Sequence, residues 1–116
     1  MIGKNAEISA KAFLQQQGLQ PIAENFRCKR GEIDLIMRDK ACLVFIEVRY
    51  RKNANFGGAK ASIDYHKQQK IITAAQYYLQ TKKLTHQCQC RFDVVCMDQQ
   101  QKIDWIKNAF YAEAVW

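Results

Sequence analysis

The chain has 116 residues, 48% hydrophobic and 25% charged, a composition that fits one compact domain over residues 1–116 and excludes a disordered protein. Eighteen Lys and Arg against eleven Asp and Glu give a net charge of +7, which favours polyanionic partners, although a merely solvated basic surface is an alternative. There is no run of about 18 apolar residues and no apolar core of a secretory signal at the start, so we expect no membrane association and a cytoplasmic location.

The first half of the chain predicts one helix followed by three strands. A helix is expected from Asn5 to about Gln17, because apolar residues recur at helical spacing, with Asn5 as N-cap and Gly18 after its end. Strands are expected over residues 22–28, 32–38 and 42–51. The short polar stretch between the last two strands predicts an antiparallel hairpin.

The second half predicts a loop, a helix and two strands. Residues 53–62 contain two adjacent glycines and are expected to form a loop. A helix is expected over residues 64–81, because four apolar residues form one stripe that would pack on a sheet: Ile71, Ala75, Tyr78 and Leu79. Strands over residues 91–97 and 102–107 follow, with a turn between them. The order predicts an α/β fold in which helices cover a mixed sheet.

Two acids, Asp34 and Glu47, lie within apolar strand-like segments, where an ionised side chain is rarely buried without a partner. Strand alternation places Glu32 and Asp34 on one face and Ile33 and Leu35 on the other. In the next strand it places four residues on one face: Phe45, Glu47, Arg49 and Arg51. If the strands are antiparallel neighbours, Asp34 and Glu47 meet.

Two adjacent carboxylates in a low dielectric either raise one pKa or recruit a cation between them. Mg²⁺ is the natural candidate, because it is held by one or two carboxylates together with water and phosphate oxygens. The alternative is that the acids pair with nearby arginines, namely Arg30, Arg38, Arg49 and Arg51.

Glu7 allows two interpretations. It borders the apolar stripe of the first helix and can reach toward the sheet, but from the residues alone a surface pair with Lys11 is favoured.

The five cysteines are expected to be reduced, partly buried thiols. Residues 86–90 hold a histidine and two cysteines, yet they lack the paired spacing of a zinc knuckle.

Several segments together carry a resemblance to a known family. They are Glu7 to Leu14, Asn25-Phe26-Arg27, Gly31-Glu32-Ile33-Asp34-Leu35-Ile36, Val44 to Arg51, Arg91-Phe92-Asp93-Val94-Val95 and Asn108-Ala109-Phe110. Over nearly the whole chain this order resembles the YraN family of small bacterial proteins. That family is similar to the restriction-endonuclease-like nucleases of the PD-(D/E)XK type, and among them to the archaeal Holliday junction resolvases.

The resemblance implies a restriction-endonuclease-like fold and a metal-dependent nuclease site. Asp34 takes the place of the motif aspartate, Glu47 that of the second acid, and Arg49 that of the motif lysine. Glu7 matches the acid that such resolvases bring from the first helix, and the Val48 carbonyl is a further candidate ligand. The implied cofactor is Mg²⁺, for which Mn²⁺ can substitute, and the implied activity is hydrolysis of DNA phosphodiesters, including branched or junction DNA. A homodimer is also implied, since a junction presents two symmetric strands.

The arginine at position 49 departs from the nuclease pattern. A lysine there can assist deprotonation of the attacking water, whereas arginine stays protonated and stabilises charge only. A nucleic-acid-binding module of the same fold with lost or weak catalysis is therefore an alternative. A protein-interaction domain, in which the acids and arginines form a structural network, is another.

Residues around the site are expected to assist it. Glu32 is expected to orient Arg30 or a metal-bound water. Nucleic-acid contacts are expected from five basic residues, with solvated lysines as the alternative for the helix: Arg30, Arg51, Lys52, Lys67 and Lys70. Three aromatic residues can either stack on unpaired bases or belong to the core: Tyr50, Phe56 and Tyr65.

Overall fold

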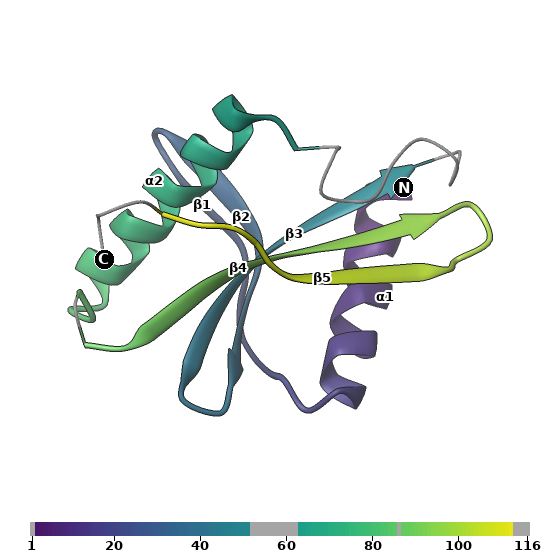
Figure 1. Ribbon diagram of the computed structural model, residues 1–116, viewed down its shortest axis with the longest axis horizontal. Helices are drawn as coiled ribbons and strands as arrows, with labels where there is room; N and C mark the ends of the chain where they lie inside the picture. The colour runs from purple at the N-terminus through teal and green to yellow at the C-terminus, as the bar shows by residue number, and fades with distance from the viewer. Residues whose placement is uncertain (1, 52–62, 86, 113–116) are drawn as a thin grey trace.

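A computed structural model of the chain describes residues 2–51, 63–85 and 87–112, which form a five-stranded sheet with a helix on each face (Figure 1). In chain order the elements are α1 (Ile2–Gln16), β1 (Gln20–Cys28), β2 (Gly31–Asp39), β3 (Cys42–Arg51), α2 (Tyr65–Thr81), β4 (Gln89–Asp98) and β5 (Ile103–Phe110). The predicted α/β order is confirmed. The loop expected over residues 53–62 lies outside the described residues, and no described helix is long and apolar enough to cross a bilayer.

The strands lie side by side in sequence order, β1-β2-β3-β4-β5. The pairs β1/β2, β2/β3 and β4/β5 are antiparallel, whereas β3 and β4 are parallel. The parallel pair arises because α2 carries the chain from the end of β3 back to the start of β4. The predicted hairpin between β2 and β3 is confirmed, since Asp39 pairs with Cys42 and Lys40 takes a φ of 56° in the turn.

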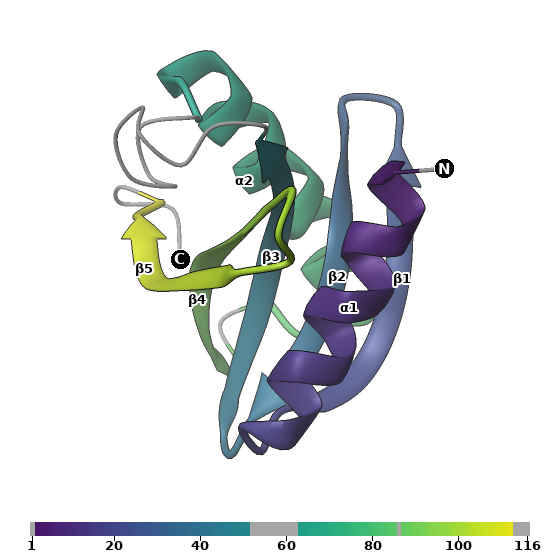
Figure 2. The ribbon, with the colours of Figure 1, turned by 90° about the vertical axis from the view of Figure 1, so that its right-hand side faces the viewer.

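The two helices bury different faces of the sheet (Figure 2). Under α1 lies a cluster that includes Leu14, Leu35, Val44, Ile46 and Val95. Under α2 lies a larger cluster that includes Ile33, Phe45, Phe92, Val94 and the predicted stripe Ile71, Ala75, Tyr78 and Leu79. The middle strands are therefore covered on both sides, so a charged side chain there must be stabilised by specific partners.

The end of α1 and the start of α2 follow the local sequence, whereas the start of α1 does not. Gly18 takes a φ of 100° after α1, and the Leu19 N–H donates to the Leu14 carbonyl, as a helix-terminating glycine does. Asp64 caps α2 by accepting the Lys67 N–H at 2.8 Å. The N-cap expected at Asn5 was wrong, because α1 already begins at Ile2 and Asn5 lies within it.

The regular alternation of side chains is interrupted where β1 and β2 pass Asn25 and Asp34. Ile33 belongs to the cluster under α2 and Leu35 to the cluster under α1, so the prediction that they share a face was wrong. On the partner strand, Asn25 has a φ of 52°. An irregularity in strand pairing changes the direction in which a side chain points. Here the irregularity falls at Asp34.

Candidate functional site

Asp34 and Glu47 lie next to each other at the point where β2 and β3 separate. The pairing of these strands runs from Asp39 and Cys42 to Leu35 and Ile46, and Asp34 and Glu47 are the next positions on either side. Beyond that point a side chain replaces the backbone as acceptor: the Asp34 Oδ2 atom accepts a hydrogen bond from the Val48 N–H at 2.8 Å. The two acids that sequence alternation brought together are therefore together in the fold.

Glu47 is in an environment that disfavours its charge. The residue is only 5% exposed. Burial, followed by the neighbouring charge of Asp34 and a hydrogen bond with it, raises the pKa of Glu47 from its ordinary 4.5 to about 8. Lys67 and Arg49 act in the opposite direction but do not cancel this effect. The two neighbouring cations are thus insufficient to stabilise the ionised form of Glu47.

The two cations near Glu47 come from different elements. Arg49, two residues further along β3, places Nη1 3.6 Å from Glu47 Oε2, and Lys67 on α2 places Nζ 3.7 Å from the same oxygen. Both cationic side chains are about one-third exposed, so they reach from solvent toward the buried acid. Contacts of this length are ion pairs without close hydrogen bonds, which is why they compensate only part of the burial cost.

Glu7 approaches the same site from α1. Burial and then the charge of Asp34 raise the pKa of Glu7, while a hydrogen bond with the Asn25 side chain lowers it. The surface pair with Lys11 that the residues alone favoured was wrong, because Lys11 Nζ lies 2.9 Å from Glu24 Oε2 on β1. Glu7 is thus left to face the sheet beside Asp34.

The donor atoms fit a divalent cation. Within residues 2–51, 63–85 and 87–112, no three His, Cys, Asp or Glu side chains lie close enough to hold a metal by themselves. Mg²⁺ needs no such cage, because one or two carboxylates suffice when water and substrate oxygens complete the shell. Asp34 and Glu47 provide that pair of hard oxygen donors. Glu7 as a third ligand, and the Val48 carbonyl, stay predictions.

The remaining predicted residues are distributed around this pair. Glu32 pairs with Arg27 across β1 and β2, at 3.3 Å, rather than with Arg30. Arg30 and Lys70 line a basic pocket that also contains Lys67. Tyr50 and Tyr65 are exposed rather than part of the core. Three predicted contributors lie outside the described side chains: Arg51, Lys52 and Phe56.

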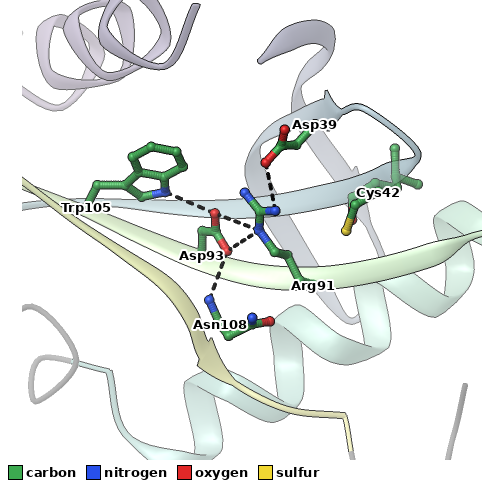
Figure 3. A network of polar contacts seen from close by, with 7 residues as sticks. Asp39, Cys42, Arg91, Asp93, Trp105 and Asn108 are labelled. Atoms are coloured by element: carbon green, nitrogen blue, oxygen red, sulfur yellow. Dashed lines mark hydrogen bonds and ion pairs between the residues drawn. The ribbon is translucent and has the colours of Figure 1, made fainter. Parts of the chain in front are cut away.

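A second buried acid, Asp93 on β4, received no role from the sequence although it also stands in an apolar strand (Figure 3). Its carboxylate accepts hydrogen bonds from Arg91 Nε at 3.0 Å, Trp105 Nε1 at 3.0 Å and the Asn108 N–H at 3.1 Å. Arg91 Nη1 also pairs with Asp39 at 2.9 Å. Asp93 therefore has partners for its charge, and it ties β5 to β4 where their register shifts.

The cysteines agree with the prediction of reduced thiols, because all five are free. The Sγ atoms of Cys88 and Cys90 lie 3.9 Å apart, but His86, the histidine of the segment weighed as a zinc site, is outside the described residues.

Comparison with known proteins places the chain in a family. The model of the uncharacterised protein family UPF0102 matches residues 6–97. A UPF0102 protein of Pseudomonas fluorescens Pf0-1 is 53% identical over 109 residues, covering 93% of this chain and 91% of its own length. UPF0102 proteins of Saccharophagus degradans and Alcanivorax borkumensis are 54% and 50% identical over 93% and 96% of the chain, and over 91% and 92% of their own lengths. The chain, which contains the carboxylate pair and its flanking cations within the matched region, belongs to the UPF0102 (YraN) family.

Proposed function

We propose that this protein is a Mg²⁺-dependent endonuclease that hydrolyses phosphodiester bonds in DNA, with Mn²⁺ as a substitute and branched or junction DNA as its substrate. The observation that carries the proposal is the Asp34–Glu47 pair. A buried carboxyl group whose pKa is raised to about 8 beside a second acid is held in an arrangement that a divalent cation would stabilise. Raised pKa values caused by burial together with a specific charge partner are typical of functional sites.

Each residue of the site has a separate role in this proposal. Asp34 and Glu47 would hold the cation, and the Val48 N–H fixes the orientation of the Asp34 carboxylate. When bound, the cation supplies charge neutralisation at the scissile phosphate and lowers the pKa of a water molecule. Arg49 stays protonated and would stabilise the negative charge that develops on the phosphate.

Lys67 could supply the ammonium group that the nuclease pattern places at position 49. The nuclease pattern expects a lysine at position 49, yet α2 brings a lysine ammonium to 3.7 Å from Glu47, almost the same distance as the Arg49 guanidinium. In this proposal Arg49 and Lys67 together bind the phosphate oxygens beside the carboxylates. Lys67→Met would then slow cleavage at least as strongly as Arg49→Met, whereas Arg49→Lys would retain it.

The direct test is cleavage of a substrate panel by purified protein in Mg²⁺ and in Mn²⁺. Linear duplex, single-stranded DNA and a four-way junction would be incubated with wild type, Asp34→Ala, Glu47→Ala and, as matched control, Asp104→Asn, which changes an exposed acid on β5. We expect both alanine variants to lose activity and the control to retain it. Cleavage that survives both alanine substitutions would reject the proposal. Sedimentation of the protein with and without junction DNA tests the implied homodimer.

A binding module with lost or weak catalysis is the second candidate, and Arg49 is the observation that favours it. Arginine cannot take the proton that a lysine at this position helps to remove. A wild-type protein that binds DNA with a steep dependence on salt but cleaves nothing would support this candidate. Affinity that does not change with salt would reject both functions.

A further inference from the structure

Two adjoining pockets follow the outer side of α2 and meet at the turn between β1 and β2. Both are lined by residues 27–30, which are the end of β1 and the turn, and their volumes are about 540 and 380 Å³. On α2 the larger pocket is lined by residues from Thr73 to Gln80, among them Tyr77, and the smaller one by Lys67 and Lys70. We call the combined surface, between residues 27–30 and the side of α2 from Lys67 to Gln80, the hairpin groove.

The walls of the hairpin groove are held together closely. A Cβ atom at Gly31, the first residue of β2, would lie 2.6 Å from the Lys70 carbonyl oxygen, closer than real Cβ atoms come. The absence of a side chain at Gly31 therefore lets β2 approach the α2 backbone directly. The groove is built from two regular elements in contact, so its shape does not depend on a loop alone.

The charge of the hairpin groove fits a polyanion. Five cations and one acid line the two pockets: Arg27, Lys29, Arg30, Lys67, Lys70 and Glu32. The acid is paired with Arg27 at 3.3 Å and Lys67 lies 3.7 Å from Glu47, so Lys29, Arg30 and Lys70 contribute positive charge with no carboxylate left among the lining residues to offset it. Clustered Lys and Arg along one path provide the electrostatic part of nucleic-acid binding.

Tyr77 indicates which kind of nucleic acid fits. The side chain is half exposed, and its ring packs at 6.2 Å from that of Phe26, which supports it from one side. A supported, exposed aromatic ring beside cations is the arrangement on which unpaired bases stack. In an intact duplex the faces of the bases are already covered by their neighbours. Pockets of this volume accommodate a group the size of a nucleotide rather than a double helix.

The hairpin groove leads to the carboxylates. Lys67, at one end, lies 3.7 Å from Glu47. Tyr77 lies ten positions further along α2, or about 15 Å at 1.5 Å per residue, a length that matches about four nucleotides at the spacing of one DNA strand. A strand stacked on Tyr77 would therefore have a phosphate near Glu47.

We propose that the hairpin groove binds a single strand of DNA and leads it to Asp34 and Glu47, so that the substrate carries an unpaired strand, as in a flap or an overhang. This inference rests on the proposed function for its direction toward the carboxylates. The binding step does not depend on metal or on cleavage, and it can be tested separately.

The test measures the affinity of full-length protein for a fluorescent single-stranded oligonucleotide and for a blunt duplex of equal length, in EDTA. We expect the single strand to bind at least about tenfold more tightly, and Tyr77→Ala to lose about tenfold of that affinity while Tyr77→Phe retains it. Tyr111→Ala, at another exposed tyrosine, should bind as wild type does. Lys70→Ala should reduce the slope of log affinity against log salt by about 0.7, whereas Lys102→Ala in the β4–β5 turn should not.

Equal affinity for the two DNAs, or wild-type affinity of a Tyr77→Ala protein that melts normally, would overturn the inference. Because EDTA removes any metal, a failure to cleave DNA has no effect on this result. Conversely, loss of the single-strand preference would leave cleavage by Asp34 and Glu47 untouched.

Discussion

Replacing Glu47 by glutamine should raise the free energy of unfolding of the metal-free protein. We expect this although the change removes the ion pairs of Glu47 with Arg49 and Lys67. The group's pKa rises from 4.5 to about 8 on folding, because burial and Asp34 disfavour the carboxylate. A group with a raised pKa contributes its full stabilisation below pH 4.5, and that contribution is lost as the pH rises through about 8. Glutamine has no proton to lose, so the variant avoids this loss.

The size of the effect follows from the shift. About 3.5 pKa units at about 1.4 kcal/mol per unit correspond to roughly 5 kcal/mol as an upper limit at pH 9. Whole domains are stable by only about 5–15 kcal/mol, so even half of this would be easily measured. The Glu47 side chain is 6% exposed, so solvent screening weakens this destabilisation only slightly.

The assay is urea unfolding in EDTA at pH 5, 7 and 9, followed by circular dichroism. The advantage of Glu47→Gln over wild type should grow with pH. Asp93→Asn is the matched control, because Asp93 is equally buried but has three hydrogen-bond donors and Arg91 as counterion. At pH 7 we expect this variant to lose about 3–5 kcal/mol, since Arg91 would keep only Asp39 as a counterion and the hydrogen bonds around position 93 would be disturbed. A Glu47→Gln protein that is no more stable than wild type at pH 9 would refute the reasoning.

Three further predictions concern single contacts. Gly31→Ala should destabilise the fold by about 1–3 kcal/mol in urea unfolding, because its Cβ would collide with the Lys70 carbonyl, and an unchanged midpoint would contradict the close approach. Trp105→Phe should cost about 1 kcal/mol through loss of its hydrogen bond to Asp93, and a neutral effect would argue against that bond. Lys67→Met should lower kcat for DNA cleavage by about tenfold or more while leaving the melting temperature nearly unchanged, and equal kcat would remove Lys67 from the site.

The sequence predicted the main elements because their periodicity reflects burial. The stripe containing Ile71 and Leu79 and the shared face of Phe45 and Glu47 are both present in the fold. Alternation also placed Asp34 beside Glu47 once an antiparallel hairpin was assumed. These features depend on local spacing, which the sequence contains directly.

The features that sequence reasoning missed depend on contacts between distant segments. Lys11 pairs with Glu24 only because α1 lies across β1, and Lys67 reaches Glu47 only because α2 crosses the sheet. The positive φ of Asn25 belongs to a residue type that tolerates it, but nothing local shows where the interruption falls. Asp93 gave the same signal as Glu47, and only its three donors in the fold distinguish a structural acid from a candidate ligand.

Metal binding by the carboxylate pair is the central claim, and a titration of Mn²⁺ followed by electron paramagnetic resonance tests it most directly. At pH 8 the wild-type protein should bind one Mn²⁺ per chain through Asp34 and Glu47, and Glu47→Gln should lose that binding while Asp104→Asn retains it. Absence of bound Mn²⁺ at millimolar concentration, or unchanged binding by Glu47→Gln, would contradict the claim.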